Sequence, residues 1–244
     1  MIVRIKFTKT GSSKFVGHLD LLRYFQKAFR RAKLDLTYSQ GFNPHPLITI
    51  AAPLGVGLTS EGEYLDVTLN SCDEPAIMID RINEAMANNI SVTDFIILPE
   101  GSKNAMAVIA AADYNISLRE GYDFLSINDF RDKFRDFYNQ DSIMIIKKTK
   151  KSEKEMDLKP LIYKYEFLDN YDLSQNDGYI PLIHLQLATG SANNIKPELV
   201  LETFCEFAGI SYNPFVFATH RVELYGDIGK GKERDLVPLN KMNN

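Results

Sequence analysis

Cysteine is scarce in this sequence: only Cys72 and Cys205 occur among 244 residues. They stand far apart, and neither belongs to a Cys-x-x-Cys motif or to a Cys/His pair at the spacing of a metal site. We therefore do not expect a disulfide framework, a zinc site or an iron–sulfur cluster held by this chain alone. We expect no metal and no cofactor in the chain itself.

Long apolar runs are missing as well. No stretch approaches the roughly 18 consecutive apolar residues that a membrane-spanning helix requires. Residues 1–7 (MIVRIKF) alternate like a strand, and they lack the charged start and apolar centre of a signal peptide. We therefore expect a cytoplasmic protein without a membrane partner.

Catalytic signature motifs are also missing. The sequence contains no Gly-x-Ser-x-Gly, no His-Glu-x-x-His, no P-loop and no dinucleotide-binding glycine pattern after a strand. Glu61 and Glu63 fall on one face of a predicted strand, where paired carboxylates can bind a metal or transfer protons. Acidic strand ends more often serve solubility, and we assign no catalytic residue.

Charge is distributed unevenly along the chain. Residues 1–50 contain nine Lys and Arg but only two Asp, which leaves a net charge of +7. Because the whole chain carries -4, the remaining 194 residues carry -11. A basic N-terminal segment on an acidic body is the most informative feature of the composition.

The length favours two domains, and a composition of 45% apolar and 25% charged residues is ordinary for globular proteins. Hydrophobic periodicity in residues 1–100 predicts the order β-α-β-β-α-β. The elements are expected at residues 2–9, 18–33, 47–52 and 63–69, in a helix that Pro75 opens, and at residues 92–98. This is the ferredoxin-like arrangement, an antiparallel sheet with both helices on one face and the other face open.

The same order can be read less regularly in the second half. Strands are predicted at residues 114–118, 142–148, 161–168, 180–188 and 215–224, with helices at residues 130–138 and 197–208. A charged segment at residues 147–154 indicates an extra hairpin. We therefore predict an α+β protein of two tandem ferredoxin-like (βαββαβ) domains, residues 1–100 and 112–225, followed by a mobile, glycine-containing tail of residues 226–244.

The predicted helix at residues 18–33 carries its cations on one side. Arg23, Lys27 and Arg30 recur at +4 and +3 opposite the apolar stripe, and Arg31 lies at the edge of this row. Several positive charges along one line suit the successive phosphates of RNA. The alternative is that the row is only the solvated face that any amphipathic helix needs.

Two prolines flank His45 in the loop after this helix and remove its flexibility. Phe42 and Asn43 beside it offer an aromatic ring and an amide to a base or another substrate group. His18, at the start of the helix, is a candidate acid or base. At 1.5 Å per residue the two histidines are expected roughly 25 Å apart, so they form no dyad. A packed loop and a first-turn hydrogen bond are the structural alternatives.

Several stretches resemble a known family. They are residues 15–23 (FVGHLDLLR), 38–46 (YSQGFNPHP), 53–57 (PLGVG) and 60–66 (SEGEYLD), with residues 157–160 and 196–198 in the second half. Together they are similar to the radical SAM-associated (radical SAM-linked) domain family of unknown function. Its members follow a B12-binding-type radical SAM enzyme domain or stand as separate chains. The resemblance implies an accessory role with a radical SAM enzyme as partner, and this chain's lack of a Cys-x-x-x-Cys-x-x-Cys triplet leaves the cluster to that partner.

These observations lead to one function hypothesis and two alternatives. The leading hypothesis is a non-catalytic accessory module that binds or presents RNA to a radical SAM enzyme. Its proposed RNA contacts are Arg23, Lys27, Arg30 and Arg31 for phosphate, and Phe42, Asn43 and His45 for a base. One alternative is a metal-independent endoribonuclease resembling the CRISPR repeat-processing enzymes, with His18 or His45 as general base. The other is an adaptor whose basic face docks an acidic protein.

Overall fold

The computed structural model describes residues 1–148, 153–169, 178–191, 193–229 and 233–242. The chain divides into two compact units. The first unit combines residues 1–111 with residues 221–244, and the second unit holds residues 112–220. Strands β6 (Ile109–Arg119) and β11 (Phe217–Asp227) each carry the chain from one unit into the other.

The sheet of the first unit is antiparallel. Its central strand β1 (Ile2–Lys9) pairs with β4 (Thr59–Ser71) on one side and with β5 (Ile90–Ile97) on the other. Two short strands, β2 (Asp35–Leu36) and β3 (Ile48–Ile50), pair with β4. Near Gly62, β4 approaches β11 so closely that a Cβ at Gly62 would lie 2.3 Å from the Val222 carbonyl oxygen. This position therefore requires glycine.

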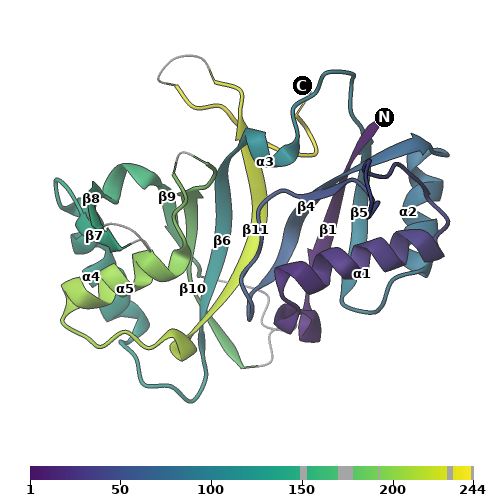
Figure 1. Cartoon of the computed structure of the whole chain (residues 1–244). Coiled ribbons are helices and arrows are strands. Elements are labelled where there is room, and N and C mark those ends of the chain that lie inside the picture. Colours follow the sequence, from purple (N-terminus) through teal and green to yellow (C-terminus); the bar gives the residue numbers. More distant parts are fainter. Residues whose placement is uncertain (149–152, 170–177, 192, 230–232, 243–244) are drawn as a thin grey trace. The chain divides into compact units, whose positions relative to one another are not determined.

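Two amphipathic helices cover one face of this sheet (Figure 1). They are α1 (His18–Arg31) and α2 (Pro75–Glu84), and the 3-10 helix η1 (Gly11–Phe15) precedes α1. Val3, Ile5 and Phe7 alternate along β1 and point into the core that these helices close. The rings of Phe7 and Phe25 meet edge to face at 4.7 Å between centroids, which joins β1 to α1.

The reverse face of the first unit is closed, which corrects the expectation of an open sheet face. The Arg4 side chain lies there with no exposed surface and donates to both carboxylate oxygens of Asp66, at 2.9 and 3.2 Å. It also donates to the carbonyl oxygen of Leu239, at 3.4 Å. Helix α3 (Ala105–Val108) joins the same network, because the Ala105 N–H donates to Asp66. A buried charge on this face thus needs chain segments packed over it.

The C-terminal segment supplies part of this cover, so the structure differs from the expected mobile tail. Strand β12 (Leu236–Pro238) pairs antiparallel with the end of β11. Leu239 and Met242 are buried, and the Asn240 amide donates to Asp94 at 2.6 Å. Three apolar side chains at Leu236, Val237 and Leu239 give this segment surface to bury despite the nearby glycines. Residues 230–232 and 243–244 lie outside the described part of the tail.

The second unit is built around aromatic side chains. Helices α4 (Ile127–Asn139) and α5 (Pro197–Ala208) meet through a cluster of rings: Phe130, Phe134, Phe137 and Phe204. Its strands are part of β6 and β11, with β9 (Ile162–Phe167) and β10 (Tyr179–Ala188) paired antiparallel. The 3-10 helices η2 (Lys159–Leu161) and η4 (Pro214–Val216) complete it. The expected extra hairpin is the antiparallel pair β7 (Met144–Lys148) and β8 (Glu153–Asp157), whose connecting residues lie outside the described ranges.

The mixed α+β class is confirmed, with a large, mostly antiparallel sheet and five α-helices in the part of the chain that the structure describes. The finer prediction of two tandem ferredoxin-like domains stays a prediction. Among the described residues, no helix combines the length and the apolar character that crossing a bilayer requires.

The buried Arg4–Asp66 pair gives a stability prediction. Arg4→Met removes the guanidinium, keeps an unbranched apolar stem and leaves the buried Asp66 carboxylate without its cation. We expect the free energy of unfolding to fall by about 3–5 kcal/mol, the usual cost of breaking a buried ion pair from one side. Urea unfolding followed by far-UV circular dichroism measures this change.

The matched control for that substitution is Arg23→Met. Arg23 is paired with Asp20 on the surface, where the two side chains are 70% and 71% exposed. Because water and salt screen an exposed pair, the expected loss is below about 1 kcal/mol. Equal losses in the two variants would contradict the central role of the Arg4 network.

Candidate nucleic-acid interface

The outer face of α1 carries the predicted row of cations. Arg23, Lys27 and Arg30 are all exposed, while Phe25 and Phe29 on the opposite side have no exposed surface. The helical period alone produces this separation, because residues three and four apart share a face. The row is therefore available to a partner along most of the helix.

These three cations differ in what neutralises them. The Arg23 guanidinium lies 3.3 Å from the Asp20 carboxylate, one turn earlier on the same helix. The side chains of Lys27 and Arg30 have no hydrogen-bond or ion-pair partner among the described residues. Two charges without a counter-ion and a third that is only screened give a local field that attracts polyanions.

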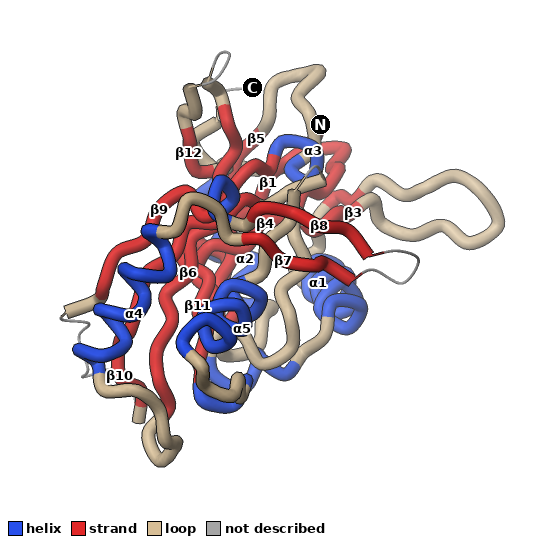
Figure 2. The backbone as a smooth tube through the Cα atoms, turned by 90° about the vertical axis from the view of Figure 1, so that its left-hand side faces the viewer, coloured by secondary structure: helices blue, strands red, loops and turns tan. Residues whose placement is uncertain are grey.

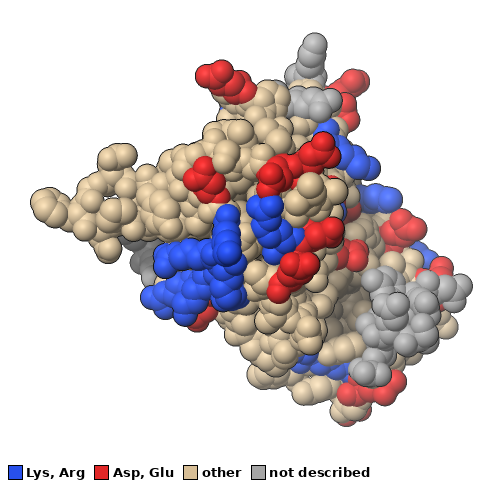
Figure 3. Space-filling view, turned by 90° about the vertical axis from the view of Figure 1, so that its right-hand side faces the viewer, with Lys and Arg blue, Asp and Glu red and all other residues tan. Residues whose placement is uncertain are grey.

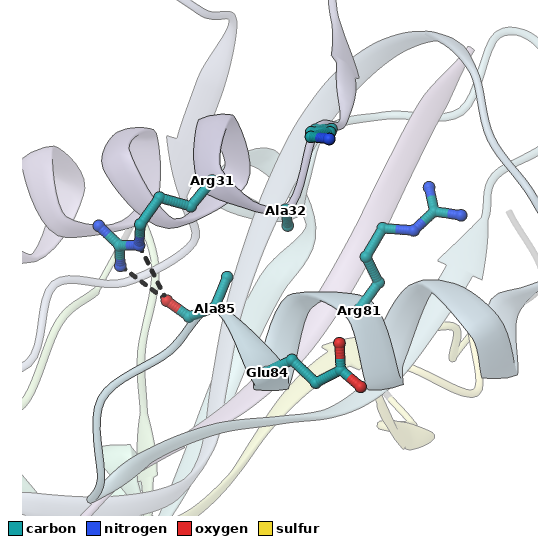
Figure 4. Close-up of a pocket in the computed structure, with 6 residues that line it drawn as sticks. Arg31, Ala32, Arg81, Glu84 and Ala85 are labelled. Carbon is teal, nitrogen blue, oxygen red and sulfur yellow. Dashed lines mark hydrogen bonds between the residues drawn. The ribbon is translucent and has the colours of Figure 1, made fainter.

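Arg31 behaves differently from the other predicted phosphate contacts. Its Nε and Nη2 atoms both donate to the carbonyl oxygen of Ala85, at 3.2 and 2.7 Å (Figure 4). Ala85 caps the C-terminus of α2, where carbonyl groups lack helical partners. Arg31 therefore joins the ends of two helices, which the sequence pattern could not indicate.

An open cleft of about 570 Å³ lies at these two helix ends. Its lining consists of Arg31, Ala32, Lys33, Arg81, Glu84 and Ala85. Arg81 also contacts the Asp73 carboxylate. Figure 3 shows the Lys and Arg side chains of this face gathered beside an uncharged projection. Arg31 and Lys33 thus carry positive charge past the end of α1, whereas Arg81 is paired with Asp73 and Glu84 lines the same cleft.

Lys33 occupies a backbone position that usually belongs to glycine. Its φ is 55°, in the left-handed region that costs an L-residue about 1–2 kcal/mol. The α1 terminus is closed by the Leu34 N–H donating to Phe29 and the Lys33 N–H donating to Arg30, at 3.0 and 3.1 Å. This bonding pattern is the Schellman motif, in which glycine is preferred at the Lys33 position. The chain thus keeps a cation where glycine would be more stable.

The loop between β2 and β3 projects away from the sheet (Figure 2). Its base is closed by a bridge between Tyr38 and Pro46 and by the Ser39 N–H donating to the His45 carbonyl at 2.9 Å. Phe42, near the middle of the loop, is fully exposed. The loop is therefore ordered at its base by these backbone contacts, and the Phe42 ring lies in solvent.

His45 is held by its own loop. Its Nδ1 atom lies 2.9 Å from Ser39 Oγ, and its backbone N–H donates to the same oxygen at 3.1 Å. The hydroxyl accepts from the backbone N–H, and the Asn43 carbonyl oxygen lies 3.4 Å from the same Nδ1, so two groups of the loop fix the position of the ring. His45 is thereby oriented without a carboxylate partner among the described residues.

His18 lies at the other end of the sheet from His45. It is the first residue of α1, which follows the last residue of β1 through η1. The loop with His45 adjoins the opposite end of β1, because Thr37 bonds to Thr68, which pairs with Ile2. With α1 about 20 Å long between these ends, the two histidines form no dyad, as the sequence predicts.

The remaining acidic and histidine candidates have structural partners. Glu63 is almost fully buried and accepts from Nε of Arg221 at 2.7 Å, so it does not form a carboxylate pair with the exposed Glu61. His184 lies with Nδ1 2.8 Å from Asn115 Oδ1 inside the second unit. Within the described residues, no group of three or more His, Cys, Asp and Glu is arranged to hold a metal ion.

The fold and this surface define a class: an α+β protein whose first unit presents a basic helix and an exposed aromatic loop. The chain belongs to the family described as "Uncharacterized protein conserved in bacteria (DUF2344)", whose model matches residues 3–197. No curated protein matches it. One similar solved structure is a chain of the "Cbf5-Nop10-Gar1 Complex", at 9% identity and a TM-score of 0.47. That match covers 91% of this chain and 48% of the other, about half its length.

The strained backbone at Lys33 gives a second stability prediction. We expect Lys33→Gly to raise the free energy of unfolding by about 1 kcal/mol, because glycine adopts the left-handed region without a Cβ clash. The control is Lys27→Gly in the middle of α1, where the same change should lower it by about 1 kcal/mol. Thermal unfolding of both variants measures the two opposite shifts. A loss of stability in Lys33→Gly would show that the lysine side chain stabilises the fold.

Proposed function

We propose that this protein is a non-catalytic accessory module that binds RNA for a radical SAM enzyme. The observation that carries the RNA part is the row on α1, where Lys27 and Arg30 have no counter-ion among the described residues. Cations that merely solvate a helix are often paired at i,i+3 or i,i+4, as Arg23 is with Asp20. The side chains of Lys27 and Arg30 are exposed and have no counter-ion among the described residues, which suits contacts to successive phosphates.

The projecting loop supports the same function. Phe42 offers an exposed ring for stacking, and Asn43 and the oriented His45 offer polar groups for a base edge. Sequence-specific RNA recognition uses this combination of aromatic stacking and hydrogen bonds to unpaired bases. In this proposal the cations position the RNA backbone, and the loop contacts bases.

The enzyme partner is proposed from the family resemblance of residues 15–23, 38–46 and 53–66. The strand order β5-β1-β4 with β2 and β3 beyond it supports the ferredoxin-like interpretation of the first unit. With two cysteines, this chain does not supply the three-cysteine motif of such an enzyme, so the partner would hold the cluster. This chain would then bind the RNA substrate, and the partner enzyme would carry out the reaction.

RNA binding across a salt series tests the proposal. We expect a steep decrease in affinity with salt and a shallower slope in the variant Arg23→Glu/Lys27→Glu/Arg30→Glu. Loss of three phosphate contacts should reduce the slope of log K against log salt by about 2 for a single strand. Fluorescence anisotropy with labelled cellular RNA fragments measures both slopes.

The matched control carries the same charge change in the second unit. Lys133, Arg135 and Lys196 are exposed there, and their triple replacement by Glu should leave the slope of the parent protein nearly unchanged. If both triple variants lose affinity equally, binding depends on net charge and not on the α1 row. Absence of RNA binding in the parent protein would overturn the RNA function and favour the adaptor alternative.

The non-catalytic part makes a separate prediction. Because His18 and His45 lie at opposite ends of β1, neither offers the other an acid–base partner, and we expect structured RNA to remain intact without metal. Denaturing gel electrophoresis after prolonged incubation measures this. Discrete cleavage that His45→Ala abolishes would contradict the proposal and support the endoribonuclease alternative.

A further inference from the structure

The aromatic side chain of Phe15 lies outside the hydrophobic core. This residue ends η1, just before α1, and 66% of its surface is exposed. The neighbouring phenylalanines of the first unit, Phe7, Phe25 and Phe29, have no exposed surface. An exposed ring of this kind has a large apolar area to offer to a partner.

The backbone that carries Phe15 is held firmly. The carbonyl oxygen of Lys14 accepts from the Gly57 N–H at 2.8 Å and from the Lys9 ammonium at 3.3 Å. Lys9 is 1% exposed, and burial lowers the pKa of its ammonium. The Ser13 hydroxyl makes a further bond to the Thr10 carbonyl oxygen at 2.6 Å. A buried cation is thus used to fix this turn, so little conformational entropy is left to lose when the ring is engaged.

A second cation lies directly at the ring. The Lys14 ammonium is 5.3 Å from the centroid of Phe15, in a cation–π contact. A base stacked on the uncovered face of the ring would bring its own phosphate within reach of this ammonium. Ring and cation together therefore match a nucleotide with an unpaired base better than they match an apolar peptide side chain.

The cation row of α1 continues from this point. α1 begins at His18, three residues after Phe15, and Arg23, Lys27 and Arg30 follow along its exposed side. Stacking followed by a line of cations is the arrangement with which proteins track single-stranded nucleic acid. A duplex keeps its bases stacked on each other and cannot use the ring.

We propose that Phe15 is a stacking platform for an unpaired base, and that the RNA bound along α1 is single-stranded. This inference rests on the proposed RNA function and names its substrate class. It also adds Phe15 and Lys14 to the interface.

The sequence contains no tryptophan, so a single introduced tryptophan reports on one site. Phe15→Trp places the reporter on the platform. Phe215→Trp is the matched control, because Phe215 is 63% exposed and belongs to the second unit. The probes are an unstructured oligouridylate and an RNA duplex of equal length, each titrated in parallel by tryptophan emission and by anisotropy.

We expect the single strand to quench the emission of Phe15→Trp with the same midpoint as the anisotropy change, and to leave Phe215→Trp unchanged. Phe15→Ala should weaken single-strand binding about 5- to 150-fold, the range that corresponds to one stacked base, whereas Phe15→Tyr should retain it. The duplex should bind more weakly than the single strand and should be insensitive to Phe15→Ala.

The outcomes separate this inference from the proposed function. If RNA binds with the expected salt dependence but Phe15→Trp is not quenched and Phe15→Ala binds normally, the stacking platform is wrong while RNA binding stands. Equal affinity for duplex and single strand would overturn the single-strand assignment. If neither probe nor cellular RNA binds, the proposed function and this inference fail together. Because Phe15 is outside the core, all three Phe15 variants should fold, and far-UV circular dichroism checks this.

Discussion

The guanidinium of Arg4 sits in the middle of the first unit's sheet, and four segments of the chain meet at it. It donates to the Asp66 carboxylate on the neighbouring strand, and neither side chain is more than 5% exposed. Its remaining hydrogen bonds go to the carbonyl oxygens of Lys103 and Leu239, and Asp66 in turn accepts from Ala105. A charge in such surroundings is tolerable only when every one of its donors is satisfied. The position of α3 and of the C-terminal segment therefore follows from this one side chain.

Closing the reverse face determines where a partner can bind the first unit. One face of the sheet is covered by α1 and α2, and the other by α3 and the C-terminal segment. The outer side of α1 and the loops at the ends of the strands stay accessible. The loop that carries Phe42 and the turn that carries Phe15 both belong to this accessible set, and both are anchored by backbone hydrogen bonds at their bases. In the proposed function, the binding groups therefore lie on rigidly supported loops and on a helix surface.

The periodicity of the sequence is sufficient to predict those structural features that depend on local spacing. The exposed side of α1, with Lys27 and Arg30, follows from the helical repeat, and the alternation of β1 predicted that Arg4 would leave the core face. Features that depend on distant residues could not be predicted in this way. In the sequence, Arg31 is indistinguishable from the other surface cations. Only the packing of α2 beside α1 shows that it donates to the Ala85 carbonyl oxygen. Phe15 gave no usable signal, because an aromatic residue in a short turn is read as core unless the packing around it is known.

The first unit is assembled from both ends of the chain, with the second unit inserted between them. Arg4 and Leu239 are separated by 235 positions in the sequence, yet they are hydrogen-bonded neighbours. Strand β11 and the C-terminal segment that complete this sheet follow the inserted unit in the sequence, so they are synthesised after β1, β4 and that unit. While the inserted unit is translated, the Arg4 face of the nascent sheet therefore stays charged and uncovered. The inserted unit can fold by itself during this time. Burial of the Arg4 charge therefore requires segments synthesised after the inserted unit, whereas α1 and the core that it closes over β1 and β4 precede that unit in the sequence.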